Sequence, residues 1–597
     1  MNLRIIDDLR SFLSAKHSVS KDLINIQLEI CPPNMDGELT VNCFKLASIL
    51  KGKPEDISSS ILEFLSAHAE IEKVNRIKAF VNFSLKADAL FRDTISDTQK
   101  IMESAKVSNK DKKRILIEYS APNTNKPLHL GHLRNNTLGM SLASLLRRVD
   151  HDVFAVNLIN DRGIHICKSM LAYKRYGNGV TPESSGKKGD HLVGEFYVRF
   201  DQELRKELAA LRESNLEYID KTDEELFALT PIGQEAQEIL IKWENSDPEI
   251  IKLWKTMNEW VISGFEVTYK RMGIKFDRVY LESDTYKLGK DIVLKGEKDG
   301  IFKRRIDGAI FADLKPFGLT EKVLLRSDNT SVYITQDIGT TLKKDSDFHP
   351  DQQIWIVGDE QIHHFKTLFA IMKVLGHTWA DRLYHLAYGM INLPSGKMKS
   401  REGTVVDADN LFDDMRDLAK SATLERLNGE IPQDIDSRSE IIAIGALKFM
   451  LLKFNPKTTI LFDPQASIKF EGDTGPYVQY VCARINSILK KYDKEDKTSD
   501  ESINWSLLDT KWEKALAVMA SFYPEALLAS AEKLDCSVLV NYLLDLSKAY
   551  NSFYRECSVL NAENSELKKA RIALSSAIKD IISDGLRTLT IDIPEVM

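Results

Sequence analysis

The sequence lacks the features that would mark a membrane, secreted or disordered protein. It has only six cysteines in 597 residues, and none of them forms a CxxC pair, so neither a disulfide framework nor a thiolate zinc site is predicted. No run of about 18 apolar residues could form a membrane helix. The N-terminal segment MNLRIIDDLRSFLSAKHS interrupts each apolar run with charge, unlike a signal peptide. We therefore expect a cytoplasmic protein with reduced thiols and no membrane partner.

Neither sign of charge dominates the chain. The sequence has 81 Lys and Arg against 88 Asp and Glu, giving a net charge of -7. Nucleic-acid binding depends on the local distribution of cations, so this balance neither requires nor excludes an RNA partner. A hydrophobic content of 43% and a charged content of 28% are ordinary for a folded chain. At roughly 100 to 200 residues per domain, the length predicts three or four domains.

The residue pattern changes along the chain and predicts a multidomain α/β protein. Residues 1–108 mix helical and strand-like patterns, which predicts an α+β domain. Residues 109–405 alternate strand, loop and helix, as in a Rossmann-like parallel sheet, with a charged helical insertion at about 181–279. We interpret residues 406–440 as a linker. Residues 441–597 show amphipathic helical patterns and predict an all-α bundle.

Strand-like segments lie on both sides of the predicted insertion, so we expect the insertion to split one sheet. These segments are 79–85 in the N-terminal domain, 114–119 and 152–160 before the insertion, and 279–283, 309–314, 322–326, 331–337 and 353–361 after it.

The first predicted strand-to-helix turn carries two histidines. His129 and His132 flank Gly131 at the start of a helix expected at 129–148. Unpaired backbone N–H groups at a helix N-terminus favour an anion, and two imidazoles could donate to phosphoryl oxygens as negative charge develops. An isolated HxxH pair is more often a metal site or a pair of capping residues, so the interpretation depends on the surrounding sequence.

A second candidate phosphate motif is GKMKSREGTVV at residues 396–406. It places Lys397, Lys399 and Arg401 in a short loop between glycines. Cations on such a loop can close over a triphosphate and stabilise the departing pyrophosphate. A lone run of this kind is usually a solvated surface turn, but its combination with HLGH predicts an ATP site.

These motifs resemble the class I aminoacyl-tRNA synthetases in their arginine-specific form. Residues 118–139 resemble the class signature, residues 396–406 resemble its mobile loop, and FEGDTGPYVQYVCARI at 470–485 resembles the family's anticodon-binding domain. The resemblance covers nearly the whole chain. It implies an arginine–tRNA ligase that activates L-arginine with ATP and Mg²⁺ and transfers it to the 3′-terminal ribose of tRNA(Arg). It also implies a monomer whose N-terminal domain contacts the tRNA elbow and whose linker contacts the stem.

The resemblance assigns roles residue by residue and implies no metal-binding side chains. The expected catalytic residues are Lys126, His129, Gly131, His132, Lys397 and Lys399. The expected ATP-binding residues are His129, Gly131, His132, Gly358, Asp359, Lys397 and Met398. The expected arginine-binding residues are Glu118, Ala121, Asn123, His132, Tyr333, Asp337 and Gln361. The expected tRNA-binding residues are Tyr477, Gln479, Tyr480, Arg484, Tyr550, Asn551 and Tyr554. An aromatic stripe at helical spacing more often packs in a core than binds RNA. The alternative for this last set is therefore that its residues belong to the core.

Two considerations bear on the choice of amino acid. Guanidinium recognition requires a carboxylate that accepts two hydrogen bonds and a planar group against the side chain. Asp337 lies four residues after Tyr333, so one helical turn would place both on one face.

Ser400 departs from the class pattern, in which a lysine commonly stands at that position, and Lys126 could supply the missing cation.

Three other functions compete with this interpretation. A class I synthetase for lysine or glutamate would share the ATP motifs. A catalytically silent RNA-binding relative would have lost charged or imidazole groups, yet His129, His132 and Lys397 are all present. A metallohydrolase using HLGH with His363 and His364 would lack the usual acidic ligands.

Overall fold

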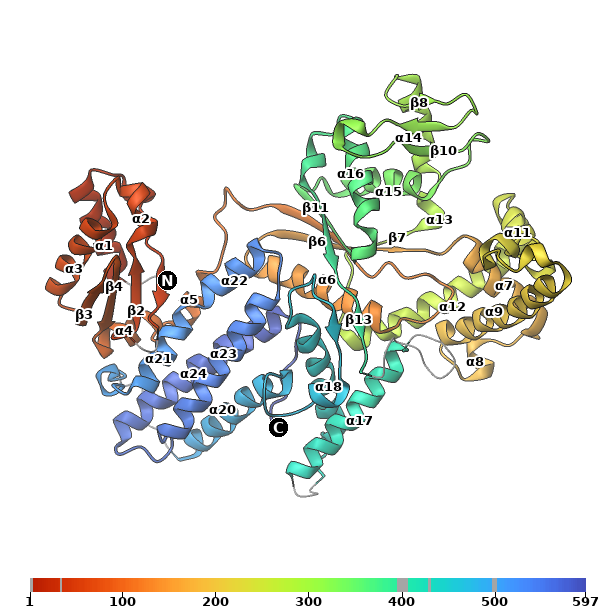
Figure 1. Cartoon of the computed structure of the whole chain (residues 1–597). Coiled ribbons are helices and arrows are strands. Elements are labelled where there is room, and N and C mark those ends of the chain that lie inside the picture. Colours follow the sequence, from red (N-terminus) through yellow and green to blue (C-terminus); the bar gives the residue numbers. More distant parts are fainter. Residues whose placement is uncertain (1–3, 33–34, 395–405, 428–430, 496–501) are drawn as a thin grey trace.

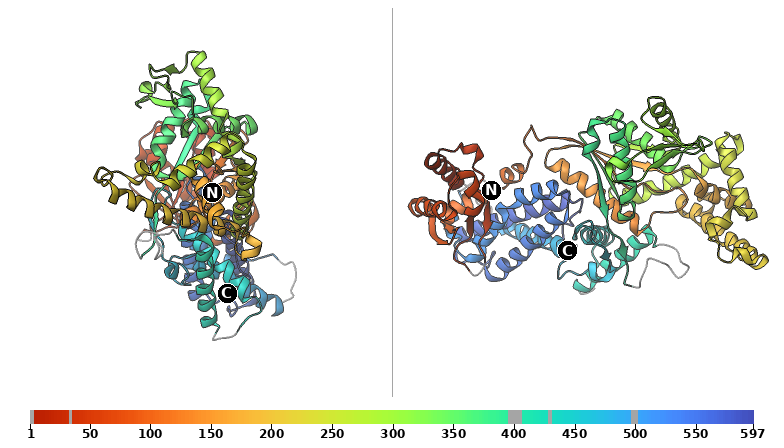
Figure 2. Two further views of the ribbon diagram at one scale, coloured as in Figure 1. Left: turned by 90° about the vertical axis from the view of Figure 1, so that its right-hand side faces the viewer. Right: turned by 45° about the horizontal axis from the view of Figure 1, so that its top comes forward.

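The computed structural model describes residues 4–32, 35–394, 406–427, 431–495 and 502–597. The molecule is elongated, with the N-terminal domain at one end and the helical insertion at the other (Figures 1 and 2). The parallel sheet lies between them, and the C-terminal helices lie beside the N-terminal domain.

The N-terminal domain is built on an antiparallel sheet of order β1-β2-β4-β3, with helices packed on it. Its elements are α1 (Arg4–His17), η1 (Lys21–Leu23), β1 (Leu28–Ile30), β2 (Leu39–Asn42), α2 (Cys43–Leu50), α3 (Pro54–Ala67), β3 (Ile71–Ile77), β4 (Phe80–Leu85), α4 (Ala87–Thr94) and α5 (Thr98–Glu103). The predicted strand at 79–85 is confirmed as β4, and the α+β character of the domain is confirmed.

The central sheet has five parallel strands in the order β12-β11-β5-β6-β7. The elements that build it are β5 (Arg114–Glu118), α6 (Leu130–Arg148), β6 (Asp152–Ile159), α7 (Ile164–Tyr176), β7 (Arg278–Leu281), α13 (Glu282–Thr285), α14 (Leu288–Lys298), α15 (Tyr333–Phe348), β11 (Gln352–Gly358), η4 (Asp359–Gln361), α16 (Ile362–Val374), η5 (Thr378–Arg382) and β12 (Leu383–Tyr388). Four of the five residues of β5 are buried, as expected for a parallel strand covered on both faces.

The helical insertion leaves the sheet after α7 and returns to it at β7. It contains α8 (Pro182–Ser185), α9 (Gly189–Ser214), η2 (Leu216–Tyr218), α10 (Asp223–Phe227), α11 (Pro231–Glu244) and α12 (Pro248–Met272). An Asp247 cap and Pro248 begin α12, and Gly273 in the left-handed region (φ 77°) ends it. As predicted, the insertion separates β5 and β6 from the later strands.

Three of the expected strands do not join the parallel sheet. Residues 309–314 and 322–326 contain β9 (Ile310–Ala312) and β10 (Lys322–Leu325), which form a separate antiparallel sheet with β8 (Lys303–Arg304); η3 (Lys315–Phe317) connects β9 to β10. The expected strand at 331–337 is wrong, because helix α15 begins at Tyr333. Short apolar runs do not distinguish a strand from the first turn of a helix.

The C-terminal region is helical, as predicted. Its elements, with the short parallel pair of β13 and β14, are β13 (Ile391–Asn392), α17 (Ala408–Arg426), α18 (Ile435–Leu452), β14 (Ile460–Leu461), α19 (Pro464–Ser467), α20 (Gly475–Glu495), η6 (Trp505–Leu507), α21 (Lys511–Ser521), α22 (Tyr523–Glu532), α23 (Ser537–Glu556) and α24 (Ser565–Thr588).

Arg134 links helix α6 to this region. Its fully buried guanidinium donates to the carbonyl oxygens of Met390, Pro456 and Thr458 at 2.7–2.9 Å. Hydrogen bonds from a charged donor are strong, and three of them compensate for burial. The helix that begins at HLGH is thereby held against the β13–β14 junction.

Gly139 lets helix α6 pack closely against Tyr119, the residue that follows strand β5. A Cβ atom at this position would overlap the ring of Tyr119, which is itself buried. We predict that Gly139→Ala lowers the free energy of unfolding by about 1–3 kcal/mol through overpacking. Urea unfolding of the full chain measures this, with Ser144→Ala on the same helix as the control. Equal stability of the two variants would contradict the prediction.

Candidate active site

The expected site residues that follow β5 and β11 lie at the carboxyl edge of the parallel sheet. The segment 119–129 follows β5, and Gly358 ends β11 with Asp359 and Gln361 in the short helix η4 beyond it. The carboxyl ends of neighbouring parallel strands meet at one edge, where ligands bind in open α/β sheets. Asn123 lies in this segment and pairs with Asn160 at the end of β6 through an isolated bridge.

The turn after β5 has two consecutive non-glycine residues in the left-handed region, Ser120 (φ 77°) and Ala121 (φ 43°). Such a conformation persists only when its surroundings hold it. The backbone N–H of Ser120 donates to Asn135 Oδ1 at 2.6 Å, and that of Ala121 donates to Asn157 Oδ1 at 3.0 Å. Ser120 Oγ also bonds the hydroxyl of Tyr269 at 2.7 Å. This turn therefore has a fixed shape just before the histidines.

His129 and His132 lie together at the start of α6, with ring centroids 3.9 Å apart. His129 is the N-cap, and its Nδ1 accepts from the N–H of Gly131 at 3.1 Å. His132 Nδ1 accepts from the N–H of His129 at 3.2 Å. A ring nitrogen that accepts a backbone hydrogen bond carries no proton, so in each neutral ring the proton is on Nε2. Both residues therefore present an Nε2–H donor at a helix N-terminus.

Burial keeps both imidazoles neutral. It lowers the pKa of His129 to about 4, with a further contribution from Lys126, and it lowers the pKa of His132 well below the usual range. Burial also lowers the pKa of the Lys126 ammonium. Lys126 is thus close enough to both rings to act on them electrostatically. Such a position is required if Lys126 supplies the cation that is missing at Ser400.

The depressed pKa of His129 predicts acid sensitivity. Between pH 6.5 and about 4, the unfolded chain binds a proton at this residue and the folded chain does not, so stability falls as pH falls through this window. The difference corresponds to about 3 kcal/mol. His129→Asn keeps an acceptor for the cap, and we expect its free energy of unfolding to decline less than that of the wild type from pH 6.5 to 4. Parallel declines in the two denaturant titrations would refute this.

Tyr333 and Asp337 lie one turn apart at the start of α15, as predicted. The Tyr333 side chain is 78% exposed. One carboxylate oxygen of Asp337 lies 2.6 Å from His364 Nε2 on α16. The sequence suggested His364 only as a metal ligand, and the adjacent pair His363 and His364 gave no signal that His364 would contact an acid.

One expected member of the arginine site, Glu118, has a cationic partner within the protein. Glu118 is buried and its carboxylate lies 2.5 Å from Lys344 Nζ, which is itself buried and stacked 4.8 Å from the centre of the Trp355 ring. The sequence did not predict this ion pair, and the expected contact of Glu118 with arginine stays a prediction. Gln361, by contrast, is exposed at the sheet edge.

The sequence did not predict a polar network that lies beside Asp337 and contains Gln336, Glu282 and Arg162. With its amide correctly oriented, Gln336 donates to Glu282 at 2.8 Å and accepts from Arg162 at 3.0 Å. The Arg162 guanidinium lies 4.0 Å from the centre of the Tyr286 ring. Burial, offset in part by Arg162, raises the pKa of Glu282 to about 7. These residues come from separate elements, and only the fold brings them together.

The expected catalytic-loop residues lie outside the part of the chain that the structure describes. They are Lys397, Met398 and Lys399, with the neighbouring Ser400 and Arg401.

The expected tRNA-binding side chains fall into two groups. Gln479 and Tyr550 are fully buried: Gln479 donates to Asp592 O at 2.7 Å, and the Tyr550 hydroxyl donates to Ser575 Oγ at 3.2 Å. Assigning these two to the RNA surface was wrong, because both are used in packing α20 and α23. Tyr554, in contrast, is 39% exposed.

The remaining members form an alternating cation–aromatic surface. Arg484 lies over the rings of Tyr480 (4.6 Å) and Tyr554 (5.1 Å) and donates to Asn551 Oδ1 at 2.6 Å. Tyr477 is half-buried nearby on α20. Arg426, over Tyr480 at 4.4 Å, extends the surface to α17; its position in the expected linker gave no sequence signal.

Comparison with known proteins identifies the class and then the family. Residues 96–463 match the family described as tRNA synthetases class I (R), catalytic domain. The flanking matches are to the arginyl tRNA synthetase N-terminal domain at 4–85 and the DALR anticodon binding domain at 478–597. The parallel sheet with HLGH at its first turn is therefore the catalytic domain of a class I aminoacyl-tRNA synthetase.

Relatives over the full length specify the family. The chain is 42% identical over 576 residues to the arginine–tRNA ligase of Bacteroides thetaiotaomicron, covering 96% of each chain. It is 43% identical over 583 residues to that of Treponema denticola, covering 96% of this chain and 95% of that one. The arginyl-tRNA synthetase structure from Thermus thermophilus matches over 100% of both chains with a TM-score of 0.77 and 25% identity. The chain belongs to the arginine–tRNA ligase family, and it uses ATP as members of this class do.

Among the described residues, no helix is long and apolar enough to cross a bilayer.

Proposed function

We propose that this site joins arginine to tRNA(Arg) in two steps. In the first, a carboxylate oxygen of arginine attacks the α-phosphorus of MgATP in line with the departing pyrophosphate, giving arginyl adenylate. In the second, a hydroxyl of the 3′-terminal ribose of tRNA(Arg) attacks the adenylate carbonyl, forming the ester and releasing AMP with loss of the hydroxyl proton. Positioning and charge stabilisation supply most of the rate, since neither step requires a covalent bond to the protein.

In this proposal His129 and His132 stabilise the α-phosphoryl group. The observation that carries the proposal is that backbone N–H groups occupy both Nδ1 atoms, which leaves both Nε2–H groups as donors beside the N-terminus of α6. Neutral donors fixed in this way need no reorganisation as charge builds on the phosphoryl oxygens. Gly131 allows the nucleotide to approach the helix backbone, and Lys126 adds a nearby cation.

We further propose that the remaining expected residues bind the three substrates, ATP, arginine and tRNA. Gly358, Asp359, Lys397, Met398 and Lys399 complete the ATP site. Ala121, Asn123 and Gln361 bind the arginine α-amino and carboxylate groups, while Tyr333 and Asp337 bind its side chain. Tyr477, Tyr480, Arg484, Asn551 and Tyr554 bind tRNA.

Arginine selection in this proposal depends on the Asp337 charge. A carboxylate that faces a neutral substrate would lose water without gaining an ion pair, so neutral amino acids are rejected without an editing site. Glu118 acts indirectly, because its pair with Lys344 fixes the end of β5. We also propose that the enzyme works as a cytoplasmic monomer.

The proposed function is tested by amino-acid-dependent exchange of pyrophosphate into ATP, with arginine, lysine and glutamate in parallel and with or without total tRNA. Arginine alone should support exchange. Exchange with lysine or glutamate and not arginine would reassign the substrate, and tRNA binding without any exchange would indicate a silent relative.

A further inference from the structure

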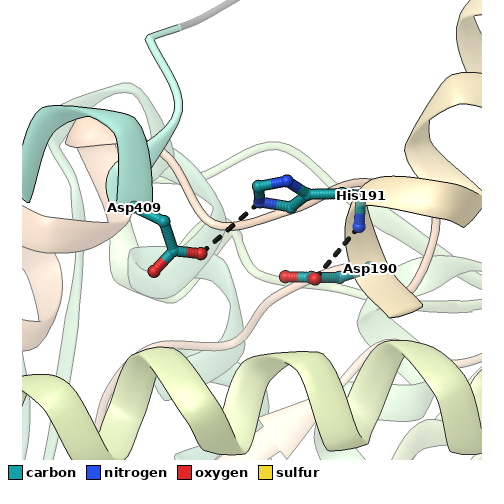
Figure 3. Close-up of side chains that lie close together, drawn as sticks. All are labelled: Asp190, His191 and Asp409. Carbon is teal, nitrogen blue, oxygen red and sulfur yellow. Dashed lines mark hydrogen bonds and ion pairs between the residues drawn. The ribbon is translucent and has the colours of Figure 1, made fainter. Parts of the chain in front are cut away.

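The start of helix α9 in the insertion contacts the start of helix α17 through charged side chains. This cluster comprises Lys188, Asp190 and His191 at the start of α9, and Asp407 and Asp409 at the start of α17. Figure 3 shows three of its side chains, with His191 lying between the two helices and directed to Asp409. Residues more than 200 positions apart in the sequence are therefore joined by charge.

Each carboxylate in the cluster has a cationic partner. His191 Nε2 lies 3.2 Å from Asp407 Oδ2 and 3.4 Å from Asp409 Oδ2. Lys188 Nζ lies 3.1 Å from Asp190 Oδ2 and forms a very short ion pair with Asp409. The neighbouring carboxylates of Asp407 and Asp409 raise the pKa of His191 to about 10, so its ring is an imidazolium at neutral pH.

The cluster is set inside the protein and is not a loose surface pairing. Asp190 is fully buried, and a Cβ at Gly264 of α12 would collide with its carboxylate. Thr268 of α12 accepts from Lys188 Nζ at 2.7 Å. Ligand atoms of Asp190, His191 and Asp409 come within 4.8 Å of one another, a spacing that would suit a metal ion. The Lys188 ammonium already lies among these carboxylates, so the cluster needs no metal to balance its charge.

Residues 406–408 are paired by their backbone with the HLGH turn. The N–H of Leu130 donates to Val406 O at 3.1 Å, and the N–H of Ala408 donates to Leu128 O at 3.0 Å. His129 and Asp407 are thus opposite each other in an antiparallel bridge. Asp407, whose carboxylate faces His191, is therefore paired through its backbone with His129.

The same helix also packs against the approach to the signature. A Cβ at Gly194 of α9 would lie 2.8 Å from Cδ of Pro127, two residues before His129. Helix α9 is therefore linked to the HLGH turn in two places. Gly194 packs against Pro127, and His191 contacts Asp407. A shift of α9 would move both supports of His129.

We propose that His191 is a positioning residue for arginine activation, holding Asp407 so that residues 406–408 stay paired with the HLGH turn and keep His129 and His132 aligned on the α-phosphate. The inference rests on the proposed roles of the two signature histidines. Misplacing a catalytic group by about 1 Å can cost up to a hundredfold in rate. The effect belongs to the transition state, so it changes kcat and leaves the KM values nearly constant.

The test uses the full-length enzyme and steady-state pyrophosphate exchange with arginine, MgATP and tRNA. His191→Gln should lower kcat about tenfold, with KM for arginine and ATP within about twofold of wild type. His191→Lys, which keeps a positive charge, should recover most of the rate. Glu195→Gln is the matched control, because Glu195 lies on the same helix in an exposed pair with Lys187 that does not reach α17.

A second variant keeps the inference testable if His191→Gln does not fold. Asp407→Asn retains the side-chain oxygen that caps α17 at Asn410 but loses the charge facing His191. It should show the same loss of kcat, and the double variant should be no slower than either single one, because coupled residues are not additive. His191→Gln activity equal to that of Glu195→Gln, or additive losses in the double variant, would overturn the inference. Wild-type exchange that is absent would instead show that the proposed function itself is wrong. Exchange that is unaffected by His132→Asn would show that the signature histidine does not have its proposed role, and the inference fails in either case.

Discussion

Asp337→Asn is expected to lower kcat/KM for arginine about 10²- to 10³-fold while leaving KM for ATP nearly unchanged. Asparagine keeps the shape of the side chain and can still bond His364, but it loses the charge that would pair with guanidinium. Removing one partner of a desolvated charge pair costs about 2–5 kcal/mol, and each 1.4 kcal/mol is about tenfold. Pyrophosphate exchange over a range of arginine concentrations measures the effect.

The control for this prediction is Asp345→Asn, a half-buried acid two turns further along the same helix. It should leave kcat/KM for arginine within about threefold of wild type, as is usual for a substitution away from the site. Citrulline, a neutral analogue of arginine, provides a second check, because Asp337→Asn should narrow the preference for arginine over citrulline. An unchanged preference would show that another group recognises the guanidinium.

His132→Asn is expected to lower kcat of arginine activation about 10²- to 10³-fold, the usual effect of losing one fixed donor to a developing oxyanion. The asparagine oxygen can take the place of Nδ1 and accept the N–H of His129, so the helix start is preserved. What it loses is the Nε2–H donor. Because this donor acts in the transition state, KM for ATP should change little.

The matched comparison is His132→Gln, whose amide nitrogen can reach the place of Nε2. It should recover part of the rate that His132→Asn loses. Equal activity of the two variants, or a tenfold rise in KM for ATP without a change in kcat, would show that His132 does not donate to the reacting phosphoryl group. Titration of His129 and His132 should also contribute nothing to the pH dependence of wild-type activity between pH 6 and 8, since the pKa of His129 is about 4 and that of His132 lies well below its usual range.

The elements that carry the chemistry were predictable from the sequence. The buried strand before HLGH, the helix after it and the return strand form a local βαβ unit, and such units follow from hydrophobic pattern and turn residues. Tyr333 and Asp337 were predictable only in part: their spacing of four placed them on one face of a helical turn, but the pattern of residues 331–337 predicted a strand where α15 begins. Family resemblance supplied their roles, which composition and periodicity did not.

Contacts across the fold were not predictable. The burial of Glu118 against Lys344 depends on a partner 226 residues away, and the burial of Tyr550 depends on how α23 packs on α24. A helical aromatic stripe looks the same whether it faces RNA or the core. The strands predicted within residues 309–326 exist, but they form a separate sheet, because the local residue pattern does not specify which strands pair.

The most direct test of the account is charging of tRNA(Arg) with arginine by the wild-type enzyme and by Asp337→Asn, measured as ester formation on the 3′-terminal ribose at limiting arginine. The account predicts efficient charging by the wild type and a loss of about 10²-fold or more in the variant. Charging by both at the same rate, or charging of lysine in preference to arginine by the wild type, would contradict it.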